Sequence, residues 1–258
     1  MREVTNQETG ELQYDILLTN TFKDLHSNEK IIVGLTNDGK PKYKPLGISW
    51  MEHPERRTYS EGAYFLPMSQ PLADGTYQKY LNKLNTWRGF AYEPIAHTLE
   101  AIEPIIDHLR GVICKHDDDA YQYFIRWIAF GIQNPEKQSG VAVVLRGLKG
   151  RGKGLIGTLL LKIFGQHSRH ISNSKQLTGN FNAHLENVCY VFADEAVFHG
   201  DAAGNQRLKA LVTEDRFTVE RKGFDAQETP NRLNILIASN DAWVVTSSHD
   251  ERRWFVLD

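Results

Sequence analysis

The chain has little of what stabilises small secreted proteins or anchors membrane proteins. Only two of its 258 residues are cysteines, too few for a disulfide framework, which indicates a reducing, cytoplasmic setting. It contains no apolar run of membrane-spanning length and no signal peptide, so we expect a soluble protein with no membrane partner. Cys114 and His116 can begin a metal site, but no second ligand pair with suitable spacing follows, which argues against zinc.

Charge of one sign, repeats and low-complexity tracts are also scarce. The formal net charge is −2, so any affinity for nucleic acid has to come from local basic patches. Hydrophobic residues make up 41% of the chain, which is enough for a proper core, and the length suits one large domain or two ordinary ones. The composition therefore indicates a globular protein.

A glycine-rich segment between a strand pattern and a helix pattern is the feature around which the chain is organised. Residues 141–146 form an apolar run rich in valine that ends in Arg146, as is typical of a buried parallel strand, and an apolar helical pattern follows the glycines. Glycines let successive N–H groups point at one anion, and a lysine and a helix N-terminus add positive charge. The residues predicted to bind phosphate are Gly147, Gly150, Gly152, Lys153 and Gly154.

One position of this loop departs from the usual phosphate-loop pattern. Gly154 stands where a serine or threonine normally helps to hold Mg²⁺. The missing hydroxyl leaves metal ligation open, but it does not weaken the prediction of phosphate binding. Thr158, one helical turn later, is a weak substitute candidate, and a packing role is the alternative for it.

A second apolar strand pattern, residues 188–193, ends in two adjacent carboxylates, Asp194 and Glu195. Carboxylates are costly to place near a core unless they have a function there. Beside a phosphate loop, Asp194 can bind the Mg²⁺ that bridges the phosphates of a nucleotide. Glu195 can orient and deprotonate the water that attacks the γ-phosphate. A strand that simply ends in an acidic surface turn is the alternative.

The rest of the C-terminal half alternates helix and strand patterns. Residues 204–212 have helical spacing, residues 217–220 alternate as a strand does, and a basic turn follows at 221–225. The strand pattern 233–238 ends at Ser239-Asn240, and Arg252 and Arg253 precede a last apolar strand. Asn240 can sense the γ-phosphate or simply begin a turn. The arginines are either surface charge or phosphate ligands. Residues 167–187 show no period and are predicted to be irregular.

We therefore predict an α/β fold whose parallel sheet carries the phosphate loop, divided into three segments. Residues 1–97 form a small, loop-rich α+β module or linker, 98–137 a helical segment and 138–258 the nucleotide-binding core. The N-terminal module is rich in aromatic residues. They can stack bases together with Lys42, Lys44, Arg56 and Arg57, but filling a small core is the favoured role.

The order of these motifs resembles the superfamily 3 helicases, a branch of the AAA+ ATPases of viruses, phages and plasmids. It is most similar to the helicase portion of phage and plasmid primase–helicase (primase–polymerase–helicase) proteins. The specific similarity covers residues 115–258, with a looser one upstream. The segments that carry it are 147–154, 177–182 (Leu-Thr-Gly-Asn-Phe-Asn), 191–196, 219–223, 237–240 and 251–254.

The resemblance implies a ring of identical subunits, usually a hexamer, with ATP and Mg²⁺ bound between neighbours. In such a ring Lys153 would bind phosphate, Asp194 the metal and Glu195 the attacking water, while Asn240 would sense the γ-phosphate. Arg253, with Arg252 beside it, would reach the nucleotide of the next subunit as an arginine finger.

Further residues would act in trans or on DNA. Lys209 would be a second basic group that reaches the neighbouring subunit. The tip of the basic hairpin would line the central pore, with Arg221, Lys222 and Phe224 on the DNA. Without the resemblance, a solvated hairpin turn is the favoured interpretation of this tip.

The predicted function is thus that of an ATP-dependent DNA helicase or translocase of phage or plasmid replication, which moves single-stranded or forked DNA through a ring in the host cytoplasm. We also expect the chain to be a piece of a longer polypeptide with a primase or polymerase domain. Two alternatives stay open. One is a P-loop nucleotide or metabolite kinase, and the other is a nucleotide-gated DNA-binding assembly module that does not hydrolyse ATP.

Overall fold

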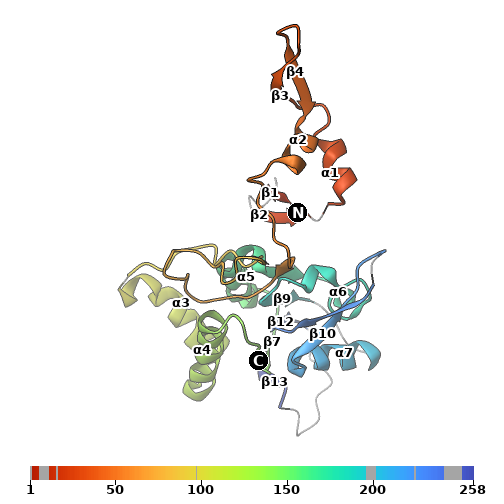
Figure 1. The fold of residues 1–258 in the computed structure, drawn as a ribbon. Coiled ribbons are helices and arrows are strands. Elements are labelled where there is room, and N and C mark those ends of the chain that lie inside the picture. Colours follow the sequence, from red (N-terminus) through yellow and green to blue (C-terminus); the bar gives the residue numbers. More distant parts are fainter. Residues whose placement is uncertain are drawn as a thin grey trace. The chain divides into compact units, whose positions relative to one another are not determined.

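The computed structural model describes residues 17–96, 98–195, 202–223, 225–240 and 252–258, together with the backbone of residues 2–5 and 12–15 (Figure 1). Internal contacts divide the chain into two compact units. Unit 1 comprises Met1–Tyr64 and Tyr80–Leu84, and unit 2 comprises Phe65–Lys79 and Asn85–Asp258. The candidate site residues that the structure describes all lie in unit 2.

Unit 1 combines short helices with antiparallel strands. Its elements are β1 (Arg2–Thr5), β2 (Leu12–Asp15), α1 (Thr19–Leu25), β3 (Lys30–Leu35), β4 (Pro41–Pro45), α2 (Leu46–Glu52) and β5 (Ala63–Tyr64). β1 pairs with β2, and β3 pairs with β4 around a turn that contains Gly39. The ring of Phe22 on α1 lies 5.2 Å from that of Trp50 on α2, which fixes the two helices against each other.

The chain that follows β5 contributes an aromatic cluster to unit 2. Trp87 is only 1% exposed and stacks on His167 with ring centroids 4.4 Å apart, while Phe65 packs against both rings. The short strand β6 (Leu84–Asn85) precedes this tryptophan. These contacts place Phe65–Lys79 and the residues from Asn85 onward with the core unit, although the sequence grouped them with the N-terminal module. The segments 1–97, 98–137 and 138–258 stay a prediction as domains.

The predicted helical region before the core is present, in four pieces. They are η1 (Leu99–Ile102), α3 (Glu103–Asp107), the π-helix η2 (His108–Ile113) and α4 (Asp118–Gln133). Asp117 caps α4, because its carboxylate accepts a hydrogen bond of 2.9 Å from the Ala120 N–H. The apolar face of α4 buries Tyr121, Phe124 and Trp127.

Five parallel strands form the central sheet of unit 2. They are β7 (Ala142–Arg146), β8 (Ser168–Ile171), β9 (Tyr190–Asp194), β12 (Asn234–Ser239) and β13 (Trp254–Leu257). Their order across the sheet is β13-β7-β12-β9-β8, and every neighbouring pair is parallel. The predicted α/β class with a parallel sheet is confirmed. The strands expected at 141–146, 188–193 and 233–238 are confirmed as β7, β9 and β12 within one or two residues.

Successive strand residues point to alternate sides of this sheet, so both of its faces carry apolar side chains. Helices cover both faces and bury these side chains. α4 and α5 (Lys153–Phe164) pack on the face that carries Val143, Phe192 and Leu236. α6 (Ser174–Thr178) and α7 (Ala202–Thr213) pack on the face that carries Val144 and Ile235. The remaining elements are η3 (Gly165–His167), η4 (Ala183–Leu185), β10 (Arg216–Val219) and β11 (Gln227–Pro230). Within the described ranges, no helix has the length and apolarity needed to span a membrane.

The structure describes β8, α6 and η4 in the stretch 167–187, so the prediction that this stretch is irregular is wrong for these three elements. β8 is an edge strand of four residues, of which only Ser168 and Ile171 are buried. Such a strand has no continuous apolar run, so its sequence gives no strand signal. Parallel pairing with the strongly apolar β9 determines its conformation.

The buried His167 makes the stability of unit 2 dependent on pH. Its Nε2 accepts from the Arg88 N–H at 3.0 Å, so Nδ1 carries the proton and donates to the Asn187 carbonyl at 3.1 Å. Burial lowers the pKa of His167 to about 3, because it penalises the charged imidazolium, while the bond to Asn187 opposes this shift.

We expect unfolding to become easier as the pH falls below the ordinary pKa of 6.5, because only the unfolded chain then takes up this proton. The free energy of unfolding falls by up to about 1.4 kcal/mol per pH unit, and it continues to fall until the pH reaches the folded-state pKa of about 3. Urea unfolding at about pH 7.5 and about pH 5 measures it. The variant His167→Gln should be less stable at the higher pH but should show a shallower dependence. Equal slopes for both proteins would refute this role of His167.

Candidate functional site

Three strand ends bring the predicted phosphate-site residues to one edge of the sheet. The carboxyl ends of parallel strands lie together, and ligands of open α/β sheets bind outside this edge. β7 leads into residues 147–154, β9 ends at Asp194 and β12 ends just before Asn240. β12 lies between β7 and β9, with Ser239 opposite Arg146 and Ala238 opposite Asp194. The fold therefore gathers the glycine loop, the acidic pair and the asparagine.

The glycine loop has the backbone conformation that the phosphate-binding prediction requires. Its φ angles are 141° at Gly147, 84° at Gly150 and 77° at Gly152, a region that favours glycine. α5 begins directly afterwards at Lys153, and no side chain caps its first turn. The N–H groups of this turn are thus oriented outward from the helix end, as in an anion-binding site.

Lys153, Asn240 and Glu195 form a continuous chain of hydrogen bonds across this edge. The Lys153 ammonium donates to the carbonyls of Gly147 at 2.6 Å and Leu148 at 3.0 Å, and to Asn240 Oδ1 at 3.1 Å. Asn240 Nδ2 in turn donates to Glu195 Oε1 at 2.7 Å. Asn240 thus fixes the distance between the cationic and the acidic side of the site.

The backbone of Glu195 is held in an unusual conformation. Its φ is 55°, in the left-handed region that non-glycine residues rarely adopt, and its N–H donates to the Ala238 carbonyl at 2.9 Å. Such strain persists only where the surrounding structure imposes it, and it is concentrated at functional sites. Here it turns the exposed Glu195 side chain toward Asn240.

Asp194 is the residue of this edge best suited to hold a metal ion. Its side chain is 42% exposed, and a carboxylate oxygen is the ligand type that Mg²⁺ prefers. His170 Nε2, on the neighbouring strand β8, lies 4.0 Å from Asp194 Oδ2. No group of three or more His, Cys, Asp or Glu side chains among the described residues is arranged around a metal position.

A charged pair ties the last strand to the start of the loop. Arg146, the last residue of β7, donates from Nε and Nη2 to the two oxygens of Asp258 at 2.6 and 2.8 Å. These bonds from Arg146 lower the pKa of Asp258 below its ordinary value. The pair is solvent-exposed, so its main effect is to fix geometry, because exposed pairs contribute little stability.

The structure adds His108, which the sequence did not indicate, to the surroundings of the loop. Its Nε2 lies 3.2 Å from the Gly152 carbonyl oxygen, and a Cβ added at Gly152 would come within 2.4 Å of the imidazole ring. His108 begins the π-helix η2, and such helices occur frequently at functional sites. The contact spans 44 positions in sequence, so no local pattern reveals it.

The paired arginines lie at the other end of the sheet, where the parallel strands begin. β13 pairs with β7 with Trp254 opposite Ala142, and the Ala142 N–H donates to the Arg253 carbonyl at 2.9 Å. Arg252 and Arg253 therefore sit where β7 begins, whereas the glycine loop follows its end. The five residues of β7 separate these positions by about 17 Å at roughly 3.3 Å per residue. The structure does not bring the arginines to the loop of their own chain.

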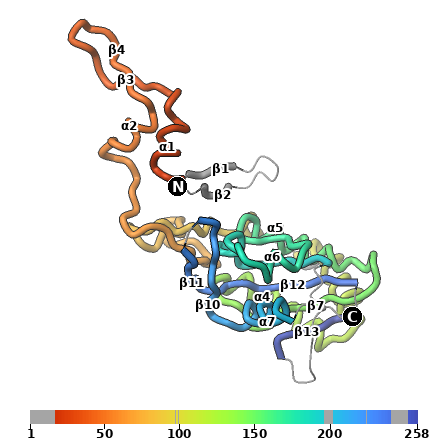
Figure 2. Tube along the Cα trace, turned by 90° about the vertical axis from the view of Figure 1, so that its right-hand side faces the viewer, coloured from red at the N-terminus to blue at the C-terminus, as the bar shows by residue number. Residues whose placement is uncertain are grey.

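The basic segment forms a turn at the end of the antiparallel hairpin β10–β11, which stands apart from the sheet strands (Figure 2). Arg221 makes an ion pair with Glu186, and Lys222 is exposed. The predicted DNA contact Phe224 lies outside the described residues. Lys209 is half-buried on α7, on the sheet face opposite α5.

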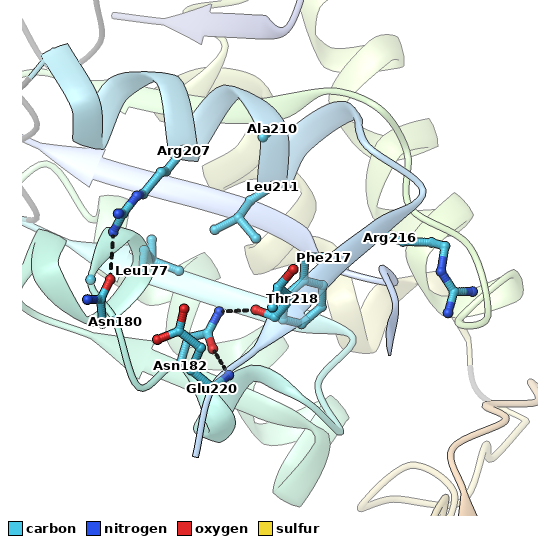
Figure 3. Close-up of a pocket in the computed structure, with 11 residues that line it drawn as sticks. Leu177, Asn180, Asn182, Arg207, Ala210, Leu211, Arg216, Phe217, Thr218 and Glu220 are labelled. Atoms are coloured by element: carbon cyan, nitrogen blue, oxygen red, sulfur yellow. Dashed lines mark hydrogen bonds between the residues drawn. The ribbon is translucent and has the colours of Figure 1, made fainter. Parts of the chain in front are cut away.

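Asn182 fastens the turn end of this hairpin to the segment 177–182, for which the sequence alone provided no role. Its side chain donates to the Thr218 carbonyl at 2.8 Å and accepts from the Glu220 N–H at 2.9 Å (Figure 3). The preceding residue, Phe181, is 61% exposed and has a φ of 58°. An exposed aromatic residue with a strained backbone thus directly precedes the residue that holds the hairpin.

A cavity of about 290 Å³ lies between this segment, α7 and the hairpin (Figure 3). Leu177, Leu211 and Phe217 supply apolar walls, and Arg207 and Glu220 supply charge. The Arg207 guanidinium donates to the carbonyl of Thr178 at 2.6 Å and to the side chain of Asn180 at 3.3 Å. Hydrogen bonds thus tie the segment to α7 on one side and to the hairpin on the other.

We expect Asn182→Ala to loosen the hairpin, because it removes both side-chain bonds to Thr218 and Glu220. Each bond contributes about 0.5–1.5 kcal/mol and both are lost, so amide exchange in residues 216–230 should become roughly 5- to 150-fold faster. Hydrogen exchange followed by mass spectrometry measures this. The matched control is Asn180→Ala, whose side chain contacts Arg207 instead. Equal exchange of 216–230 in both variants would contradict this role of Asn182.

Comparison with known proteins identifies relatives of this chain. Residues 145–253 match a family described as a family of unknown function, DUF5906. The chain is 28% identical over 183 residues to the DNA primase-polymerase of Nitratiruptor phage NrS-1. This alignment covers 70% of the chain but only 25% of that protein.

Solved structures of the C-terminal region of NrS-1 have a similar fold. One apo structure superposes with a TM-score of 0.56 at 29% identity and covers 64% of this chain and 39% of the other. An A-form apo structure has a TM-score of 0.62 at 25% identity and covers 84% of this chain and 53% of the other. The chain is thus homologous to part of the NrS-1 primase-polymerase, within its C-terminal region.

Proposed function

We propose that the chain is an ATP-driven motor that moves single-stranded DNA, of the superfamily 3 branch of AAA+ ATPases. The observation that carries this proposal is the hydrogen-bonded chain from Lys153 through Asn240 to Glu195 beside the glycine loop. These bonds join an ammonium, an amide and a carboxylate, which supports the roles of phosphate ligand, sensor and general base that hydrolysis of a nucleoside triphosphate requires.

The residues at the carboxyl edge suit ATP with a divalent ion. The N–H groups of the loop and of the first turn of α5 would bind the phosphates, and Lys153 would exchange its carbonyl partners for phosphate oxygens. Asp194 would hold Mg²⁺, which neutralises charge on the phosphates. Glu195 would take a proton from the attacking water, while Asn240 would hold Glu195 in place and contact the γ-phosphate.

The position of the arginines favours a site completed by a second copy of the chain. Arg252 and Arg253 lie at the amino edge of the sheet, about 17 Å from their own loop by strand length. A finger from this edge would therefore act on the nucleotide of a neighbour, in a head-to-tail interface that closes into a ring. A hexamer is the proposed state, with Lys209 as a second basic group in trans.

The hairpin supplies the proposed contact with DNA. Lys222 is exposed at its turn, beside Arg221, and would bind phosphates of the strand. Phe181, which directly precedes Asn182, is a further exposed aromatic ring on which a base can stack. Phe224, outside the described residues, stays a proposed contact on sequence grounds.

The NrS-1 relative supports a role in DNA replication, because it is a DNA primase-polymerase. We propose that this chain likewise acts in phage or plasmid replication, with a primase or polymerase module as partner or as part of the same polypeptide. The chain spans only about a quarter of the length of that relative, so the activity of the whole protein is part of the proposal.

A second candidate function follows from Gly154. Without a hydroxyl at this position, one usual metal ligand is missing, and a loop of this kind can bind nucleotide without hydrolysing it. The chain would then be a nucleotide-gated, DNA-binding assembly module. Measurement of turnover separates the two functions.

The decisive experiment measures release of phosphate from ATP with Mg²⁺, with and without single-stranded DNA. We expect turnover that DNA stimulates, loss of ATP binding in Lys153→Ala, and retained binding with hydrolysis reduced at least about 100-fold in Glu195→Gln. Lys162→Ala is the matched control, because this exposed lysine lies in the last turn of the same helix.

Two outcomes would contradict the motor. Full turnover in Glu195→Gln would remove Glu195 from the mechanism, and nucleotide binding without turnover in an assembled, DNA-bound ring would favour the assembly module. Transfer of phosphate to a small acceptor instead of water would identify a kinase.

We also expect Arg253→Ala to lose hydrolysis by on the order of 10³-fold while it still binds ATP. Mixing it with Glu195→Gln subunits should restore part of the activity, because some interfaces then combine an intact Glu195 with an intact Arg253 from the neighbour. Phosphate release from mixed and separate variants measures this. If mixed assemblies form, as judged by their mass, and stay inactive, the arginine does not act in trans.

A further inference from the structure

The loop lacks a metal-ligating hydroxyl, and the space for it is open. A Cβ added at Gly154 would meet no atom within 4 Å, and Gly154 lies in the first turn of α5 without a positive φ. Nothing steric therefore excludes a serine at this position. If the chain binds a nucleotide with Mg²⁺, the ion has one protein ligand fewer than usual, so the remaining ligand has to be oriented well.

His170 is placed to provide this orientation. It lies on β8 opposite Phe192 of β9, and its ring stacks on Phe192 with centroids 5.5 Å apart and an interplanar angle of 22°. Asp194 follows Phe192 by two residues, so both side chains leave β9 on the same face. The stack thus directs His170 Nε2 toward Asp194 Oδ2, at 4.0 Å.

The packing of α5 shows that this face is the one on which the phosphate loop opens. A Cβ added at Gly157 would come within 2.4 Å of the Phe192 ring, so α5 lies directly over Phe192. From this contact the helix runs back about 4.5 Å to Gly154, and the strand runs forward about 6.6 Å to Asp194. Both lead to the carboxyl edge of the sheet, because the helix after a parallel strand runs antiparallel to it.

We propose that His170 is a positioning residue that orients the Asp194 carboxylate toward the metal ion and so compensates for the missing hydroxyl at Gly154. This inference rests on the proposed nucleotide site. The separation of 4.0 Å is longer than a direct hydrogen bond and is the reach of one bridging water. Outer-shell partners of this kind orient metal ligands, and their loss typically lowers metal affinity about 10- to 100-fold.

The test measures binding of a fluorescent, non-hydrolysable ATP analogue at increasing Mg²⁺ concentration and, separately, in EDTA. We expect His170→Ala to require roughly 10- to 100-fold more Mg²⁺ for half-maximal tight binding, with unchanged affinity in EDTA. His170→Gln keeps an N–H donor and should stay close to the wild type. Bound Mn²⁺, observed by electron paramagnetic resonance, gives a second readout that does not depend on hydrolysis.

The variant Gly154→Ser provides the sharpest control, because it returns a hydroxyl to the open space at the loop. In the double variant with His170→Ala, the added serine should restore most of the lost Mg²⁺ affinity, so that the Mg²⁺ midpoint returns toward that of the wild type. An unchanged Mg²⁺ midpoint in His170→Ala would overturn the inference, as would an equal loss of affinity in EDTA, which indicates a merely structural role. If the wild-type chain binds no nucleotide at all, the proposed function itself is wrong.

Discussion

The position of β12 between β7 and β9 is the constraint on which the candidate site depends. Neighbouring strands lie about 4.8 Å apart, so the loop strand and the acidic strand are separated by about 10 Å. Asn240, at the end of the strand between them, spans this gap through bonds to Lys153 at 3.1 Å and Glu195 at 2.7 Å. Neither β7 nor β9 can form this connection without the intervening strand.

The same bonds define the surroundings of the Lys153 ammonium. The Lys153 ammonium donates hydrogen bonds to two loop carbonyls and to Asn240. Phosphate oxygens can replace these neutral acceptors with charged ones, and bonds between charged groups are stronger. If Lys153 exchanged Asn240 for a phosphate oxygen, the hydrogen bond from Asn240 to Glu195 would change as well. The site is thus connected from its cationic to its acidic side.

A second set of contacts connects the hairpin to the core. Asn182 and Glu186 both belong to the segment between β8 and β9, and they hold the hairpin through its backbone and through Arg221. The hairpin is therefore attached to the chain that leads directly into the acidic strand β9. This is a physical link between the proposed DNA contact and the proposed catalytic edge.

The strongly apolar strands and the loop could be predicted from sequence, because their signals are local. The apolar runs that form β7, β9 and β12 are buried on both faces of the sheet. The closely spaced glycines of residues 147–154 are typical of a loop whose backbone needs positive φ angles. β8 could not be predicted, since its four residues alternate little and depend on pairing with β9. Filling a small core was the favoured role of the aromatic residues in the N-terminal module, but Trp87 packs in unit 2 on His167, which lies 80 positions further along the sequence.

The sequence by itself determined the α/β class, the glycine loop between β7 and α5 and the order of the motifs, because strand periodicity and glycine-lysine spacing are properties of neighbouring residues. Only the tertiary structure decided which of these residues meet. Strand order placed Asn240 between Lys153 and Glu195, register placed Arg252 and Arg253 at the far edge, and packing brought His108 and His170 to the site. These contacts join residues distant in sequence, and their geometry is set by the sheet and not by local preference.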